Sequence, residues 1–128
     1  MREGVAWCQT VNADALLITL KKSDTDYSPT TMYRDFALSP VLFHWESQST
    51  TSSSSPTGQR YLNHRENGSH ILLFVREAKT NSLGTAPYVF LGPADYVTHE
   101  GDRPIAITWR LRRPMPMEMF IASRAAVA

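Results

Sequence analysis

Short apolar segments alternate with polar ones along the chain, and the spacing of the apolar residues favours strands over long helices. In residues 104–112 every second side chain is large and apolar, which places these side chains on one face of a strand. Residues 15–20 and 70–76 are continuous apolar runs, typical of buried strands. The predicted strands cover residues 15–20, 35–38, 41–46, 70–76, 88–91, 96–99 and 104–112.

Turn residues separate these strands, and Gly92-Pro93 is expected to end the strand over 88–91. Two short helices are predicted over 59–64 and 117–125. Because six or seven short strands occur without long helical crossovers, a parallel doubly wound sheet is not expected. We predict a mostly β (α+β) fold, a small and mostly antiparallel β-barrel with one or two short helices, as a single domain over residues 1–128.

Composition narrows the class of protein. One cysteine, Cys8, rules out an internal disulfide, and its apolar neighbours predict a buried, unreactive thiol. The first ten residues lack the apolar core of a signal peptide, and no apolar run approaches the ~20 residues that span a bilayer, so we expect a cytoplasmic protein without membrane contact. The net charge is only +1, but the segment after Gly101 contains five arginines and only two acidic residues, which suggests a basic strip.

The motifs of the common enzyme classes are missing from the sequence. It contains no Gly-x-Ser-x-Gly elbow, no Walker A motif and no Gly-x-Gly-x-x-Gly. The four histidines are scattered, and neither His-Glu-x-x-His nor Cys-x-x-Cys occurs. We therefore expect no catalytic residues, no metal and no cofactor, and a binding function for this chain.

The segment 43–65 carries the strongest functional signal. A polar loop of almost only Ser and Thr separates Trp45 from Tyr61, two aromatic side chains able to stack on a flat ligand. Long polar loops inside a small domain are usually functional or disordered. Trp45 shares a strand face with Phe43, so the alternative is that Trp45 packs in the core.

The candidate site residues fall into two groups. The side chains predicted to contact a base, by stacking or through its polar edge, are Trp45, Tyr33, Tyr27, Asp35, Ser47 and Gln48, with Asn63 as a further candidate. The side chains predicted to contact phosphate are Arg60, His64, Arg65, Arg110 and Arg112. For Arg60, His64 and Arg65 the alternative is an ordinary solvated face.

Several segments resemble one bacterial domain over about residues 13–120. These are LFHWESQSTT, SPTGQRYLNH, HILLFVREAK, APYVFLG, YVTHEGDRPIAITWRL and PMPMEMF. They are similar to the domain of unknown function that closes the C-terminus of DEAD/DEAH-type helicases with a phospholipase-D-like nuclease, a group that includes SauUSI-type type IV restriction enzymes. The resemblance implies an SRA-like, PUA-type barrel that recognises modified cytosine in DNA, with a flipped 5-methylcytosine in an aromatic pocket.

The resemblance also sets the expected partners. Helicase and nuclease motifs are absent from this sequence, so we expect neither ATP hydrolysis nor cleavage from it. The expected partners are double-stranded DNA with a modified base and the helicase and nuclease domains of a parent protein. Two alternatives stay open, a protein-interaction or dimerisation module that uses Met115, Met117 and Met119, and a reader of modified RNA or a small nucleotide.

Overall fold

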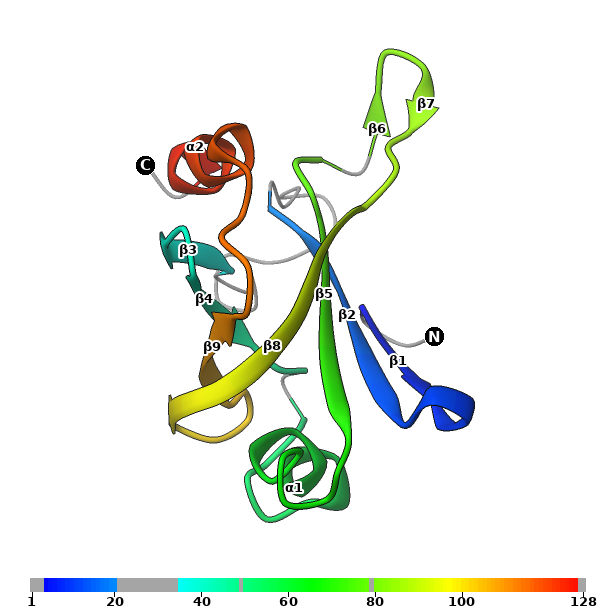
Figure 1. The fold of residues 1–128 in the computed structure, drawn as a ribbon, viewed down its shortest axis with the longest axis vertical. Helices are drawn as coiled ribbons and strands as arrows, with labels where there is room; N and C mark the ends of the chain where they lie inside the picture. Colours follow the sequence, from blue (N-terminus) through cyan, green and yellow to red (C-terminus); the bar gives the residue numbers. More distant parts are fainter. Residues whose placement is uncertain (1–3, 21–34, 49, 79, 127–128) are drawn as a thin grey trace.

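The computed structural model describes residues 4–20, 35–48, 50–78 and 80–126. Figure 1 shows one large bent sheet with two helices at its ends and a small separate hairpin. The strands are β1 (Val5–Cys8), β2 (Ala13–Thr19), β3 (Phe36–Ser39), β4 (Leu42–Glu46), β5 (His70–Arg76), β6 (Thr80–Asn81), β7 (Gly84–Thr85), β8 (Val89–Glu100) and β9 (Ala106–Leu111). The helices are a 3₁₀ turn (Gln9–Val11), α1 (Pro56–Leu62) and α2 (Met117–Ala126).

Seven strands form the sheet in the order β1-β2-β5-β8-β9-β4-β3. The long strand β8 pairs with β5 along its first half and with β9 along its second half, so it joins the two halves of the sheet (Figure 1). The pair β2–β5 is parallel, and the other strand pairs in this sheet are antiparallel. A parallel pair needs a crossover, which here contains β3, β4 and α1.

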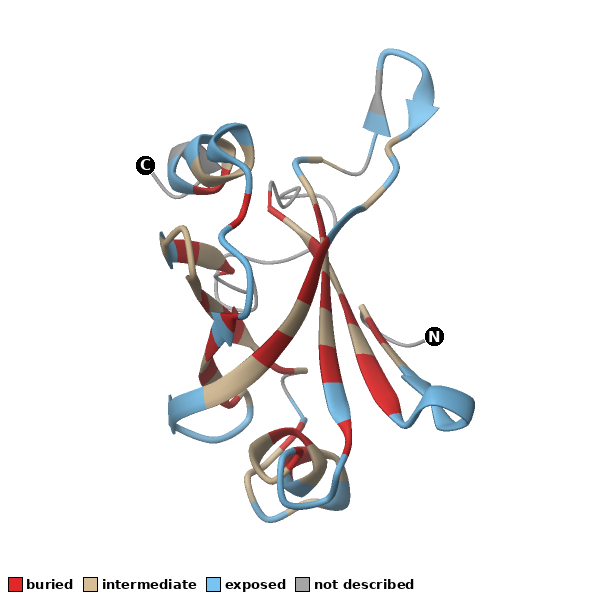
Figure 2. Cartoon of the chain, in the orientation of Figure 1, coloured by how far each residue is buried: buried red, intermediate tan, exposed pale blue. Residues whose placement is uncertain are grey.

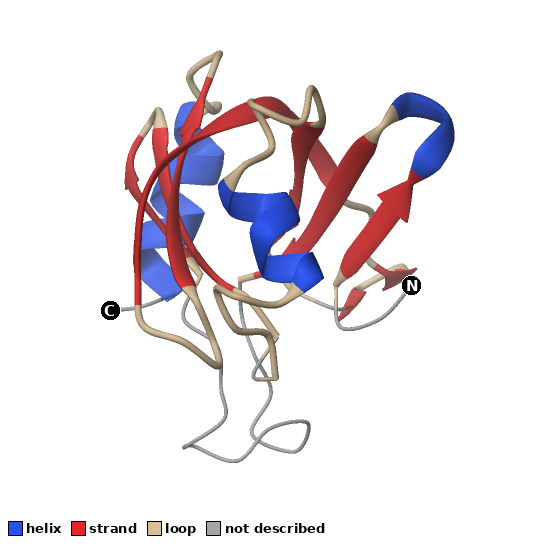
Figure 3. Ribbon diagram, turned by 90° about the horizontal axis from the view of Figure 1, so that it is seen from below, coloured by secondary structure: helices blue, strands red, loops and turns tan. Residues whose placement is uncertain are grey.

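The predicted barrel is wrong, because the sheet formed by the described strands stays open between its edge strands β1 and β3. The mostly β class with two short helices is confirmed. Figure 3 shows how the bent sheet curves around one side of α1, while α2 lies near the other end. Helix α2 packs on β3, where the Ser123 hydroxyl accepts a hydrogen bond of 2.6 Å from Ala37 N–H. A curved sheet with helices at its ends therefore encloses the core without closing into a barrel.

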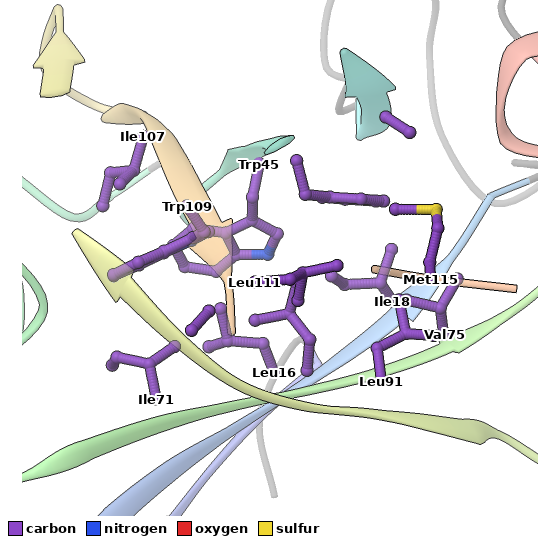
Figure 4. Close-up of a cluster of buried hydrophobic side chains, with 14 of the residues drawn as sticks. Leu16, Ile18, Trp45, Ile71, Val75, Leu91, Ile107, Trp109, Leu111 and Met115 are labelled. Carbon is purple, nitrogen blue, oxygen red and sulfur yellow. The ribbon is translucent and has the colours of Figure 1, made fainter. Parts of the chain in front are cut away.

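The core fills the concave side of the sheet (Figure 4). The alternation predicted for residues 104–112 is confirmed, since every second side chain from Ile105 to Leu111 is buried (Figure 2). Phe43 and Trp45 of β4 face the same core, and Tyr61 of α1 is fully buried beneath them. Burying large side chains of this kind contributes about 1.5–3 kcal/mol each.

Two predictions about β8 and the N-terminus were wrong. Gly92-Pro93 lies inside β8, where Gly92 has φ +98° beside an irregular pairing with β5, so the glycine bends the strand and does not end it. Cys8 is exposed, because it is the last residue of the edge strand β1. The sequence pattern did not predict this strand. The hairpin β6–β7 is formed by two strands of two residues each.

Candidate nucleic-acid interface

The Ser/Thr loop between β4 and α1 is held by its own hydrogen bonds. The buried Ser47 hydroxyl accepts a 2.8 Å bond from Ile105 N–H and donates to the Gln48 carbonyl oxygen at 3.1 Å. Ser55 caps α1, where its hydroxyl accepts from Gly58 N–H at 3.1 Å. A Cβ at Gly58 would overlap the Ser52 carbonyl oxygen, so the loop packs directly on the helix.

The same loop is tied to the turn between β8 and β9. Asp102 accepts a 2.6 Å bond from Ser53 N–H, and Arg103 N–H donates to the Thr51 carbonyl oxygen at 3.0 Å. The Ser53 hydrogen bond lowers the pKa of Asp102. These contacts make the described part of the loop a scaffold that joins α1 to the sheet.

Trp45, predicted as a wall of a base pocket, lies in the core. Its side chain is 4 % exposed, and its ring packs edge-on to Tyr61 at 5.3 Å and against Trp109 at 6.3 Å. A pocket wall needs an accessible face, so the structure assigns Trp45 to the scaffold. The shared strand parity with Phe43 was the sequence signal for this position.

The other residues predicted to contact a base differ in burial and in their hydrogen-bond partners. Asp35 is buried and accepts a 2.9 Å bond from Glu46 N–H, and Ser47 is buried as described above. Gln48 is half-buried, and its amide oxygen accepts from the Thr51 hydroxyl at 3.4 Å. Tyr27 and Tyr33 lie outside the described residues. The described members of this group do not line a common open surface.

Arg60, predicted to hold phosphate, is paired inside the fold. Its guanidinium donates two hydrogen bonds to Asp14, Nε to Oδ2 at 2.7 Å and Nη2 to Oδ1 at 2.8 Å. It also lies over the Trp7 ring, 4.7 Å from the ring centroid. The hydrogen bonds that Arg60 donates to Asp14 raise the pKa of Arg60, and the Asp14 side chain is completely buried. Arg60 therefore compensates a buried carboxylate.

His64 is buried between the end of α1 and β8. Its Nε2 accepts a 3.0 Å bond from Tyr96 N–H, so the ring proton is on Nδ1, which lies 3.3 Å from the Ser69 carbonyl oxygen. Burial lowers the pKa of His64, more than the Ser69 bond raises it. A neutral, buried imidazole fixes β8 and is not available to a phosphate.

The remaining predicted phosphate contacts gather around Asp95 on β8. Arg112 donates two hydrogen bonds to Asp95, Nε to Oδ2 at 3.1 Å and Nη2 to Oδ1 at 3.0 Å. Arg110 lies directly opposite Asp95 in the β8–β9 pairing, which places both side chains on one face. Arg65 is close enough to contribute to the lowered pKa of Asp95, after the larger effect of Arg112. We call Arg65, Arg110 and Arg112 with Asp95 the arginine surface.

An open hollow of about 540 Å³ adjoins the arginine surface, and Arg65 belongs to both. The hollow lies between the end of α1 and β8, and its lining residues are Leu62, Asn63, Arg65, Glu66 and Tyr96. The Tyr96 hydroxyl lies 2.7 Å from Nδ1 of His99. The hollow therefore combines one aromatic ring with amide, carboxylate and guanidinium groups.

Sequence reasoning missed Asp14, Asp95, Glu66 and Tyr96. The signal for Asp95 is its position opposite Arg110, which requires the strand register and is not visible in the sequence. Asp14 lies inside β2 at a position that the apolar run 15–20 did not include. A charged residue at a buried strand position indicates a partner, but the sequence does not say which one.

Two features are absent from the described residues. No three His, Cys, Asp or Glu side chains among them are grouped so that they could hold a metal ion. In the same part of the chain, no helix has the length and apolar character needed to cross a membrane.

Comparison with known proteins identifies the family of this chain. No curated protein matches the chain. The family model described as a domain of unknown function (DUF3427) matches residues 3–122, nearly the whole sequence. The chain therefore belongs to the DUF3427 family of domains.

Proposed function

We propose that this domain binds double-stranded DNA through the arginine surface. The observation that carries the proposal is the convergence of Arg65, Arg110 and Arg112 around a single carboxylate, Asp95. Three arginines against the carboxylates of Asp95 and Glu66 leave an excess of one positive charge, and Arg65, Arg110 and Arg112 are exposed. Guanidinium groups suit phosphate because they offer planar pairs of donors and stay charged.

The finer proposal is that the domain is the target-recognition module of a cytoplasmic, modification-dependent restriction system. Its support is the sequence resemblance given above, which implies a modified cytosine such as 5-methylcytosine as the target and helicase and nuclease domains as partners. In this proposal the chain binds DNA and catalyses no reaction. The sequence interpretation assigned the base contacts to Asp35, Gln48, Tyr27 and Tyr33, of which Asp35 is buried and Tyr27 and Tyr33 lie outside the described residues.

A titration of labelled duplexes, followed by fluorescence anisotropy, tests both levels. We expect binding that weakens steeply as salt rises, because each neutralised phosphate releases counterions. Replacing Arg110 and Arg112 together by Gln should weaken binding to every duplex. Arg124→Gln on α2 is the matched control, because Arg124 lies on a different element from the arginine surface.

The outcomes separate the two levels. Absence of duplex binding at low salt would contradict DNA binding altogether. Equal affinity for unmodified, methylated and hydroxymethylated duplexes of one sequence would retain DNA binding and exclude recognition of the modification.

A second candidate function is protein interaction, and one observation favours it. Apolar side chains are exposed at the start of β8 and on α2, among them Phe90, Met117 and Ile121. They accompany a hollow of about 380 Å³ lined by Val89, Met119 and Ala122 with Glu77 and Glu118. Of the three methionines predicted for this role, Met115 is buried in the core and Met119 packs against it. Sedimentation of the chain over a concentration series would detect self-association.

A further inference from the structure

We propose that the hollow between α1 and β8 receives a single nucleobase that has left the DNA stack, with Tyr96 as the stacking surface. The inference rests on the proposed DNA binding and gives it a site that differs from the pocket predicted around Trp45. The base class is one with an exocyclic amine, such as cytosine.

Tyr96, the aromatic residue of the hollow, is held at its backbone and at its hydroxyl. Tyr96 N–H is bonded to Nε2 of the buried His64, and its hydroxyl is bonded to His99. A side chain that is fixed before the ligand arrives loses little freedom on binding. Tyr96 is half-buried and packs partly against the core, and it also lines the open hollow, so the accessible part of its side chain can contact a flat ligand.

Polar groups of both kinds lie at the hollow, as the edge of a base requires. Glu66 supplies carboxylate oxygens, which accept hydrogen bonds from an exocyclic amine such as N4 of cytosine. Asn63 supplies an amide whose Nδ2 donates to the Gln59 amide oxygen at 2.6 Å, which fixes its orientation. Thymine offers a carbonyl oxygen in place of this amine, so Glu66 disfavours it.

The phosphate of the same nucleotide has a neighbouring site. Arg65 lines the hollow and also lies beside Asp95, which Arg112 holds from β9. Tyr96 pairs with the buried Trp109, whereas Asp95 pairs with Arg110, so Tyr96 and Arg110 lie on opposite faces of β8 and β9. A nucleotide whose base enters the hollow therefore has its phosphate next to the Arg65 guanidinium. The volume of about 540 Å³ lies within the range of ~300–1,000 Å³ that is usual for small-ligand sites.

The test compares two duplexes of one sequence, one fully paired and one with a single extrahelical cytosine. An unpaired base avoids the cost of unpairing, so the wild-type domain should bind the second duplex about tenfold more tightly. Tyr96→Ala should abolish this preference, and Tyr96→Phe should retain most of it because the ring remains. Phe90→Ala is the matched control, since Phe90 is an exposed ring on the same strand outside the hollow.

A second arm replaces the extrahelical cytosine by thymine. Wild type should prefer cytosine, and Glu66→Gln should reduce that preference, because a neutral amide is a weaker acceptor for the amine. Thermal unfolding of each variant shows whether it is folded. If Tyr96→Ala is not folded, Glu66→Gln carries the test, because an unchanged preference for cytosine over thymine in this variant would contradict the base site.

The outcomes are distinguishable from those of the proposed function. If wild type binds the paired duplex but shows no preference for the extrahelical base, the hollow is not a base site and DNA binding stands. The same conclusion follows if the preference exists but survives Tyr96→Ala in a folded protein. If no duplex binds, DNA binding itself is wrong, and the base site fails with it.

Discussion

Two aspartate–arginine pairs in this domain have the same bidentate geometry but opposite surroundings. Asp14 and Arg60 meet at 2.7 and 2.8 Å, and their side chains are 0 % and 28 % exposed. Asp95 and Arg112 meet at 3.1 and 3.0 Å, and theirs are 24 % and 54 % exposed. The first pair joins β2 to α1 within the fold, whereas the second lies on the outside of β8 and β9.

The contrast shows that geometry alone does not define what an ion pair does. A buried carboxylate must keep its partner, because water cannot replace the lost interaction. An exposed pair exchanges its partner for water or for a ligand at little cost. Arg60 is therefore committed to the fold, while Arg112 can share its donors with a phosphate.

The largest expected effect is on the buried pair. Arg60→Met should lower the free energy of unfolding by about 3–5 kcal/mol, because it leaves Asp14 charged, buried and unpaired. Urea unfolding followed by circular dichroism measures the change. Combining it with Asp14→Leu removes both charges and should recover much of the loss. If Arg60→Met lowers the free energy of unfolding by less than about 1 kcal/mol, the Asp14–Arg60 pair contributes no more to stability than an exposed ion pair does.

The next effect separates burial from charge. Ser47→Ala removes the hydroxyl that accepts from the buried Ile105 N–H, and it should cost about 1–3 kcal/mol although no charge is involved. Ser54→Ala, at an exposed serine of the same loop, is the control and should leave stability nearly unchanged. If Ser47→Ala changes the free energy of unfolding as little as Ser54→Ala does, the Ser47 hydroxyl does not stabilise the loop.

A smaller effect concerns pH, because neutral His64 lies beneath the strand that carries the exposed pair. The folded pKa of His64 is below its usual value of 6.5, so the unfolded chain binds more protons just below that pH. Its contribution to stability is complete above pH 6.5 and is lost as pH falls from 6.5 toward the lowered folded pKa. His64→Gln should remove this part of the pH dependence of unfolding. A pH profile that is identical in the variant would contradict the neutral, buried imidazole.

The exposed pair should show the smallest effect on stability. Arg112→Met should change the free energy of unfolding by at most about 1 kcal/mol, and less in high salt, which screens exposed charges. In the plot of the logarithm of DNA affinity against the logarithm of salt concentration, the same variant should reduce the slope by about 1, the value for one lost phosphate contact. Titrations at several salt concentrations measure the slope, with Arg124→Met as the control. A large loss of stability would assign Arg112 to the fold.

The sequence predicted the strand content better than the site. The alternating pattern of residues 104–112 and 41–46 identified β9 and β4 and the side chains that face the core. Successive side chains of a strand point to opposite faces, so the local order of apolar and polar residues shows which side chains are buried. It could not predict that β2 and β5 pair in parallel or that β1 and β3 leave the sheet open. Pairing depends on contacts between distant segments, which no local pattern records.

The candidate site shows the same division. Residue type alone marked Arg60, Arg65, Arg110 and Arg112 as phosphate contacts, and Trp45 as a stacking surface, since these side chains have the required chemistry. Only the tertiary structure separates Arg60 from the other arginines and moves Trp45 into the core, because the burial of neighbouring Asp14 and the packing of Tyr61 arise between segments far apart in the chain. The sequence by itself thus determined which chemical groups are available, and the packing of the bent sheet on α1 decided which of them remain accessible to a ligand.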